Sequence, residues 1–223
     1  MKMKITKNYL MLAIIFTSIL IVSNITGMKI SQFGDVHLSA AVLLFPITYV
    51  ISDILTEVYG FAASRTVIWL AIFANMIVVL AAYGLCFVPA SEQWSHEDAF
   101  NTIFKFSPII FIASIVSYLL GEFINAIILA KLKILTHGRY FFIRAILSTI
   151  FSAFIDTAIF NTIAFLHMLP IAVLLNIMIT EFCLKILVEV LIFPLTKAAT
   201  NYLKRVDKID YYDAQTQFNP FLL

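Results

Sequence analysis

Charged residues are scarce in this chain of 223 residues. Only 13% of the residues are Asp, Glu, Lys or Arg, whereas a soluble domain carries about 25%. Hydrophobic residues make up 62%, and apolar runs of about 20 residues, each long enough to cross a bilayer as a helix, recur along the chain. These runs do not alternate as the strands of a membrane barrel do. The scarcity of charge therefore excludes a soluble domain and predicts an all-α integral membrane protein.

Cysteine and histidine are also rare, which bears on metal and catalytic sites. Cys86 and Cys183 both lie in apolar runs, which is typical of small buried side chains. The four histidines show no metal-ligand spacing. HExxH, GxSxG and Walker A sequences are all missing. An intramembrane hydrolase built on Asp53 and Asp156 is conceivable from the residue types alone, but no signature surrounds either residue. We expect no enzyme, no metal site and no cofactor.

The apolar runs predict a six-transmembrane-helix bundle that forms one domain over residues 1–223. The helices are expected at residues 9–28, 38–59, 65–88, 108–132, 142–166 and 171–196, and a short cytoplasmic tail at 197–223. The first run also resembles a cleaved signal peptide, because basic residues precede it. Its length, and the lack of a small-residue cleavage site close behind it, favour a retained helix.

The basic residues indicate an orientation for this bundle. With six spans, twelve of them fall on the side that carries both termini, and two, Lys29 and Lys105, on the opposite side. The longest loop of that opposite side, "ASEQWSHEDAFN", is acidic. Since Lys and Arg are retained on the cytoplasmic side of a membrane, both termini are expected to be cytoplasmic.

Ionisable residues inside the predicted helices are the main functional signal. Each costs at least about 2.5–3.5 kcal/mol near the bilayer centre, unless it is paired, hydrated or bound to a ligand. Residues three or four apart share one helix face, so the polar residues form one stripe on each of four helices. The stripes are Tyr49, Asp53 and Glu57; Ser114, Tyr118, Glu122 and Asn125; Arg144, Ser148, Ser152 and Asp156; and Glu181, Lys185 and Glu189.

Some of these polar residues have a purely structural explanation. Lys185 is able to pair with Glu181 or Glu189 on its own helix, and Ser148 and Ser152 are suited to close helix packing. The carboxylates, however, outnumber the buried cations. The excess must be protonated, hydrated or neutralised by a ligand, which favours a passage or binding cavity over inert packing.

Four stretches of this sequence resemble the queuosine precursor transporters, also called the vitamin uptake transporter (VUT) family. They are "FPITYVISDILTEVYGFAASR", "GEFINAIILAKLK", "RAILSTIFSAFIDTAIF" and "EFCLKILVEVLIFPLT", with "SNITGMKI" as a weaker fifth match. Other residues on the family's motif positions include Pro46, Gly60, Arg65 and Gly121. In one departure, Ser152 and Ala153 stand where the family usually has Gly and then an amide residue, a type of side chain suited to hydrogen bonding with a base edge.

The resemblance implies a multi-pass protein of the bacterial inner membrane that imports a deazapurine for tRNA modification: 7-cyano-7-deazaguanine, 7-aminomethyl-7-deazaguanine or queuine. Its partners would be this small molecule and the lipid bilayer, with no direct contact to nucleic acid, and a homodimer is compatible with the sequence. The substrate-binding residues expected on this basis are Asn24, Asp53, Glu57, Glu122, Asn125, Asp156 and Lys185. Supporting roles fall to Tyr49, Arg144, Ser148 and Glu181.

Two further expectations concern the ends of the second helix and the class of transporter. Pro46 is expected to break that helix near its outer end, and Arg65 to anchor a helix rather than bind ligand. The alternative function is the substrate-binding subunit of an energy-coupling-factor type vitamin importer, also a small six-helix protein. The first helix, "NYLMLAIIFTSILIVSN", lacks the alanine at every fourth residue by which such subunits dock on their partner.

Overall fold

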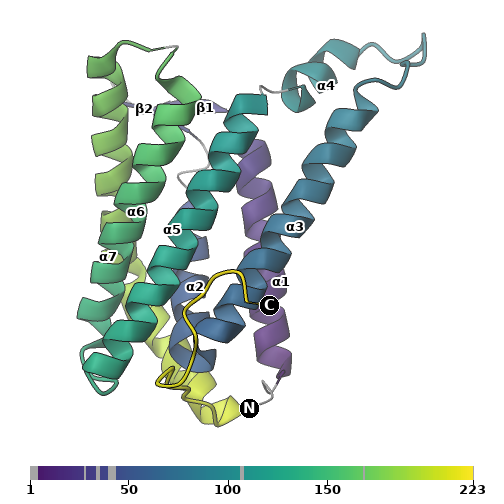
Figure 1. Cartoon of the computed structure of the whole chain (residues 1–223). Coiled ribbons are helices and arrows are strands. Elements are labelled where there is room, and N and C mark those ends of the chain that lie inside the picture. Colours follow the sequence, from purple (N-terminus) through teal and green to yellow (C-terminus); the bar gives the residue numbers. More distant parts are fainter. Residues whose placement is uncertain are drawn as a thin grey trace.

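The computed structural model describes residues 5–27, 29–33, 36–39, 44–105, 108–167 and 169–222. Seven helices and one two-stranded hairpin form in these ranges (Figure 1). In chain order they are α1 (Lys7–Thr26), β1 (Ile30–Phe33), β2 (Val36–Ser39), α2 (Phe45–Tyr59), α3 (Phe61–Leu85), α4 (Glu97–Phe104), α5 (Pro108–Leu135), α6 (Phe141–Phe165) and α7 (Ile171–Asp207). The expectation of a helical membrane protein is confirmed, with the hairpin as an unpredicted addition.

The long helices stand side by side in one bundle, and the β-hairpin and α4 lie in the longer connections at one of its ends (Figure 1). We call the end that carries Lys7, Gly60, Gly138 and Asp207 the proximal end. The end that carries Thr26, the β-hairpin and α4 is the distal end. α5 packs mainly against α6, and α7 packs against α6 and α2.

Five helices are long and apolar enough to cross a membrane: α1, α3, α5, α6 and α7. The sequence predicts six spans, and the difference lies in α2. With 15 residues, α2 is only about 22 Å long, against a hydrocarbon thickness of about 30 Å. The predicted helix over 38–59 starts too early because β2 occupies Val36–Ser39 and pairs with β1. An apolar run alone does not distinguish a strand from the beginning of a helix.

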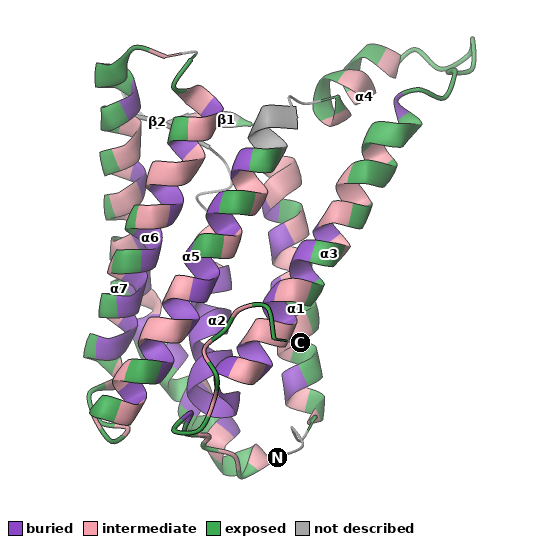
Figure 2. Cartoon of the chain, viewed as in Figure 1, coloured by how far each residue is buried: buried purple, intermediate pink, exposed green. Residues whose placement is uncertain are grey.

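Helix α2 is the centre of the bundle. Thirteen of its residues are buried, and it contacts α1, α3, α5 and α7. The long helices instead expose apolar side chains on their outer faces, as Leu70, Phe73 and Ile77 do on α3. Figure 2 shows this division, with the buried colour gathered on α2 and on the inward faces around it. The long helices thus present the surface suited to lipid, and α2 is enclosed by protein.

Proline and glycine set the limits of α2. Pro46 lies in its first turn, where the missing N–H is no loss to the helix, so Pro46 begins this helix instead of breaking it. Gly60 has a φ of 87° and is the single residue between α2 and α3. This left-handed conformation, which glycine adopts at no steric cost, reverses the chain so sharply that α3 begins at Phe61, earlier than the predicted residue 65.

The chain beyond the predicted sixth helix is more ordered than a tail. Helix α7 continues to Asp207, because the segment after Thr196 stays amphipathic, with Thr196, Thr200 and Leu203 buried. In the acidic loop predicted between the third and fourth helices, Glu97–Phe104 forms the short helix α4.

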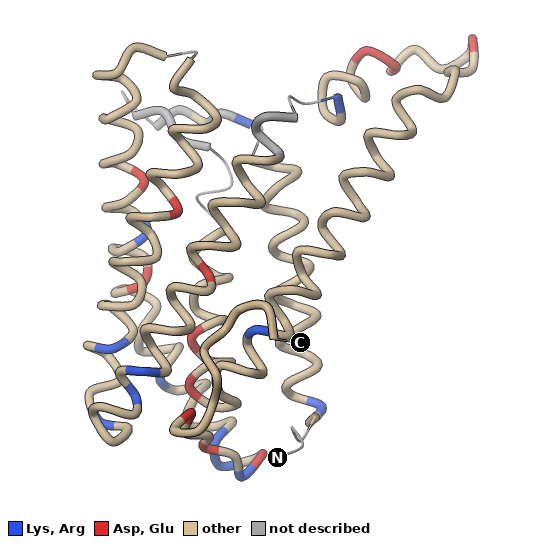
Figure 3. The backbone as a smooth tube through the Cα atoms, viewed as in Figure 1, with Lys and Arg blue, Asp and Glu red and all other residues tan. Residues whose placement is uncertain are grey.

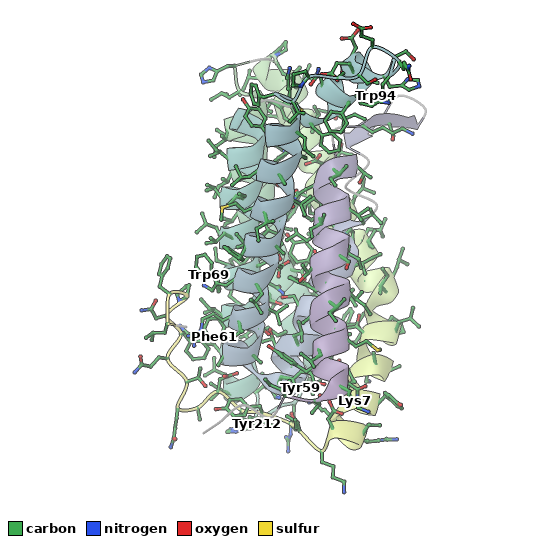
Figure 4. The ribbon with its side chains drawn as sticks, turned by 90° about the vertical axis from the view of Figure 1, so that its right-hand side faces the viewer. Lys7, Tyr59, Phe61, Trp69, Trp94 and Tyr212 are labelled. Carbon is green, nitrogen blue, oxygen red and sulfur yellow. The ribbon has the colours of Figure 1, made fainter. Side chains whose placement is uncertain are left out.

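Residues 208–222, which we call the strap, lie across the proximal part of α3 and α5. The N–H of Tyr211 donates to the carbonyl oxygen of Val58 at 3.0 Å, and the carboxylate of Asp213 accepts the N–H of Phe61 at 3.0 Å. Arg65 donates to two strap carbonyls, and Trp69 donates to the carbonyl of Pro220 at 2.7 Å. Figure 4 shows the strap beside Phe61 and Trp69. Arg65 is therefore an anchor, as expected, and what it anchors is the strap.

Candidate functional site

Six acidic residues of the helices are buried, each at most 7% exposed as a whole residue. They are Asp53, Glu57, Glu122, Asp156, Glu181 and Glu189. Figure 3 shows acidic positions spread along the bundle, with basic positions crowded near its proximal end. Four of them form a central group, Glu57 belongs to a proximal network with very different surroundings, and Glu181 lies toward the distal end.

The central group consists of Asp53, Glu122, Asp156 and Glu189, one from each of α2, α5, α6 and α7. Asp53 interacts electrostatically with Glu122 and Glu189, and Glu122 does so with Asp156. Four helices thus bring four carboxylates to one region of the interior. All four lie on the polar stripes of the sequence, and three of them, Asp53, Glu122 and Asp156, are among the predicted binding residues.

Asp156 is the neutralised member of the central group. The ammonium group of Lys185 donates to Asp156 and, at 3.0 Å, to the hydroxyl of Thr157. The hydroxyl of Tyr49 also donates to Asp156, at 3.2 Å. Lys185 therefore pairs across to α6 and not within its own helix. This one cation is the only lysine or arginine bonded to a central carboxylate among the described residues.

The other three central carboxylates keep oxygens without a partner. Asn125 donates its side-chain N–H to one oxygen of Asp53 at 2.7 Å, and the second oxygen has no hydrogen bond in the described structure. Neither oxygen of Glu122 or of Glu189 has one either; the hydroxyl of Ser52 is near Glu122 but outside hydrogen-bonding geometry. A buried carboxylate in this condition is stable only when it is protonated, hydrated or bound to a ligand that donates to it.

Hydroxyl groups that also lack a partner accompany these carboxylates. Tyr118 lies one turn before Glu122 on α5, and its buried hydroxyl has no hydrogen-bond partner among the described residues. The same holds for Thr149 on α6. Ser148, predicted as a supporting residue, instead donates to the carbonyl of Ala145 at 2.9 Å, within its own helix. Its hydroxyl proton is therefore engaged by the backbone.

Gly121 sets how closely α5 approaches α6. A Cβ atom on Gly121 would lie 3.0 Å from the Cβ of Asp156 and 3.6 Å from the carbonyl oxygen of Ser152. Only glycine allows this contact without displacing a neighbour. Because Glu122 follows directly in the chain, the same contact fixes Glu122 and Asp156 near one level of the bundle.

The proximal network is built around Glu57. Arg144 makes two hydrogen bonds to its carboxylate, at 2.6 and 3.1 Å, and Lys204 adds a third at 2.7 Å. Both oxygens of Glu57 are therefore occupied by charge-assisted hydrogen bonds, the strongest kind that a carboxylate forms. Glu57 and Arg144, predicted in the binding site, are thus bound to each other.

Lys133 joins this network to the strap. Its ammonium group donates to the carbonyl oxygen of Glu57 at 2.5 Å, to Asp210 at 2.6 Å and to the carbonyl oxygen of Tyr211 at 2.8 Å. Lys204 also pairs with Asp210, at 2.9 Å. Burial raises the pKa of Asp210, but the hydrogen bonds from the two lysines lower it further, so the net pKa is below the usual value. Asp210 is thus held in its charged form.

Two other predicted residues lie toward the distal end. Asn24 accepts a hydrogen bond from Ser114 at 2.6 Å, and Ser114 precedes Glu122 by eight residues, about 12 Å along α5. Glu181 accepts a hydrogen bond from Asn161 at 2.9 Å. Of the predicted binding residues, the structure groups Asp53, Glu122, Asn125, Asp156 and Lys185 around Tyr49, and leaves Asn24 and Glu57 outside.

Sequence reasoning placed Glu189 on a polar stripe but not among the site residues. The signal was available, because Glu189 lies four residues after Lys185 and so shares its helix face. What was missing is the tertiary contact. Only the folded bundle shows that Lys185 turns to Asp156 and leaves Glu189 without a cation.

Comparison with known proteins identifies the type of protein to which this site belongs. Residues 39–199, which include every central carboxylate, match the family model described as "Putative vitamin uptake transporter". The chain belongs to the vitamin uptake transporter family. This family member is also 27% identical over 179 residues to a "Probable queuosine precursor transporter" of Bacillus subtilis (strain 168), a match that covers 79% of this chain and 78% of the relative. No solved structure matches the chain.

Proposed function

We propose that this vitamin uptake transporter imports queuosine precursors across the bacterial inner membrane for tRNA modification. The candidates are 7-cyano-7-deazaguanine, 7-aminomethyl-7-deazaguanine and queuine. One observation carries the proposal: Asp53 and Glu122 are fully buried and present carboxylate oxygens that no described group satisfies. The name of the Bacillus subtilis relative is consistent with it.

The chemistry of a deazaguanine complements such oxygens. Its N1–H and 2-amino group lie side by side, so one carboxylate can accept both in a pair of charge-assisted hydrogen bonds. Glu122, with both oxygens without a partner, is suited to this edge. A second carboxylate, Asp53 or Glu189, would then face the substituent at position 7, and it would favour a cationic aminomethyl group over a neutral cyano group.

Other residues of the central group would orient the ligand. The carbonyl oxygen of the heterocycle requires a donor, and the side-chain amide of Asn125 and the ammonium group of Lys185 are the donors at hand. Tyr49 and Tyr118 supply buried aromatic rings near the carboxylates, suited to packing on a flat ring.

The distribution of charge supports an orientation of this importer in the membrane. The proximal end carries the basic residues Lys133, Arg144 and Lys204, so we place it in the cytoplasm. The enclosed helix α2 begins at Phe45 within the bundle and carries Asp53. Short, interrupted helices near the substrate are a recurring feature of transporters. In this arrangement the ligand enters past the distal end, binds the central group and leaves past Glu57.

The test is uptake in a bacterial strain that neither makes deazaguanines nor has an importer of its own. The gene is expressed there, each precursor is supplied at nanomolar concentration, and queuosine in tRNA is measured by gel shift. We expect queuosine to be restored by the wild type and lost in Glu122→Gln. Glu92→Gln, which changes an exposed glutamate between α3 and α4, is the matched control and should behave as wild type.

Two outcomes would contradict the proposal. Full uptake by Glu122→Gln would show that the central group does not recognise the substrate. If wild-type protein is present in the membrane but restores no queuosine, deazaguanines are not its substrates. Co-purification with an ATPase would then indicate the energy-coupling-factor alternative.

A further inference from the structure

We infer that a groove between α6 and α7 at the proximal end is a binding site for a phosphate group, such as that of an anionic lipid. A cavity of about 340 Å³ lies there, next to the proximal network and away from the central group. Its walls include Phe141 and Phe142 from α6 and Phe193, Lys197, Thr200 and Lys204 from α7. This volume is at the lower end of the roughly 300–1,000 Å³ that is usual for ligand pockets.

The polar residues of α7 are spaced to face one ligand. Lys197, Thr200, Asn201 and Lys204 follow each other at intervals of three, one and three residues, so they share one face of the helix over two turns. All four line the cavity. Two ammonium groups flanking a hydroxyl and an amide form a donor set that suits the oxygens of a phosphate.

Thr200 and Lys197 have hydrogen-bond donors that no described acceptor occupies. The hydroxyl of Thr200 is 1% exposed and has no hydrogen-bond partner among the described residues. A buried hydroxyl that lines a cavity without a partner points to a ligand in that cavity. Lys197 forms no ion pair with any described carboxylate, whereas Lys204 is paired with Glu57 and Asp210.

The first turn of α6 adds further donors. Tyr140 precedes it in a left-handed conformation with a φ of 55° and provides no side-chain cap. The first amide N–H groups of a helix have no acceptor within the helix, and together with the helix dipole they favour an anion. Phe141 and Phe142 of this turn line the cavity.

The charge around the groove also favours an anion. Glu57 is the only acidic residue in its wall, and its oxygens are occupied by Arg144 and Lys204. A deazaguanine needs acceptors for its N–H groups, and the groove provides donors. The groove is therefore suited to a different ligand from the central group.

The surroundings indicate how such a phosphate would arrive. Phe142 and Tyr140 are 45% and 67% exposed beside the cavity, at the end of the bundle where aromatic residues occupy the membrane interface. Basic pockets between membrane helices on the cytoplasmic side bind lipid headgroups. A headgroup phosphate in the groove would leave its acyl chains along the outer faces of α6 and α7.

The experiment compares lipids and free phosphate on the purified full chain. The protein is placed in nanodiscs of phosphatidylglycerol and phosphatidylcholine in equal amounts, and the lipids retained on release are counted by native mass spectrometry. A parallel arm records the melting temperature in detergent with added inorganic phosphate. The variants are Lys197→Gln and Thr200→Val, and Arg205→Gln is the matched control, because Arg205 is an exposed cation of the same helix outside the cavity wall.

We expect wild type and Arg205→Gln to retain several-fold more phosphatidylglycerol than phosphatidylcholine. In Lys197→Gln this ratio should fall about fivefold. Thr200→Val preserves shape and should weaken retention in the same direction, so a folding defect in one variant does not decide the result. Stabilisation by inorganic phosphate that depends on Lys197, without a lipid preference, would assign the same site to a soluble phosphate. Equal behaviour of wild type, Lys197→Gln and Thr200→Val in both arms would overturn the inference.

Discussion

Glu57 and Glu122 are two glutamates at the same degree of burial, in opposite surroundings. Glu57 is 1% exposed and receives hydrogen bonds from Arg144 and Lys204. Glu122 is 2% exposed and receives none from any described group. A buried charge that is fully paired is compatible with a stable fold. A buried charge without a partner lowers stability unless a ligand binds it. The difference separates a structural end of this transporter from the proposed binding region.

The largest expected effect comes from removing the compensated charge. Glu57→Gln leaves the buried Arg144 without a carboxylate partner and Lys204 with Asp210 alone. Breaking a buried ion pair of this kind costs about 3–5 kcal/mol. We expect a clearly lower melting temperature of the purified protein in detergent and less protein in the membrane. An unchanged melting temperature would show that the network does not stabilise the proximal end.

The same substitution at the uncompensated position should act on binding. Glu122→Gln removes a charge that no partner needs, so stability should stay the same or rise. Ligand affinity should fall by roughly 10- to 100-fold, because a hydrogen bond to a charged group contributes about 1.5–3 kcal/mol. Direct binding of each deazaguanine to purified protein, beside the melting temperature, measures both quantities on one sample. A drop in stability with unchanged affinity would reverse the roles assigned to the two glutamates.

Gly121 tests whether the central group depends on helix spacing. Gly121→Ala forces a Cβ to 3.0 Å from Asp156, and overpacking of this kind costs about 1–3 kcal/mol. Because the displaced residue holds Lys185, we expect weaker ligand binding along with lower stability. Gly84→Ala on α3 is the control, since a Cβ there meets no atom within 4 Å; equal effects of the two changes would rule out the contact as the cause.

The smallest expected effect concerns the strap. Arg65→Gln removes two hydrogen bonds from a partly exposed side chain to the carbonyl oxygens of Gln217 and Asn219, at a cost of about 0.5–1.5 kcal/mol each before screening by solvent. Faster hydrogen exchange confined to residues 214–222, with ligand affinity unchanged, is the expected result. A loss of affinity would connect the strap to the central group and weaken the division between the two regions.

The sequence was sufficient for the helices and the stripes, but not for the division between Glu57 and Asp53. Both lie on one face of α2 because they are four residues apart, and that periodicity says nothing about what faces each of them. The partners of Glu57 include Lys204, which belongs to a segment expected to be a tail. The ammonium group of Lys133 reaches Asp210 and Tyr211 in the strap. Contacts between segments so far apart in sequence are set by tertiary packing, which local patterns do not encode.

The start of α2 was unpredictable for a related reason. The segment from Leu38 to Pro46 is apolar enough to continue a membrane helix, and only the pairing of β2 with β1 removes its first residues from that helix. A helix enclosed on all sides also does not need the length that lipid demands of a helix facing it.

The position of the strap has a consequence for the biogenesis of this protein. Lys133 is translated and inserted with α5, but two of its three acceptors, Asp210 and the carbonyl oxygen of Tyr211, follow the whole of α7 in the chain. Until residues 208–222 have been synthesised, the ammonium group of Lys133 lacks these two acceptors. Completion of the hydrogen bonds at the proximal end is thus a late step in the synthesis of the chain.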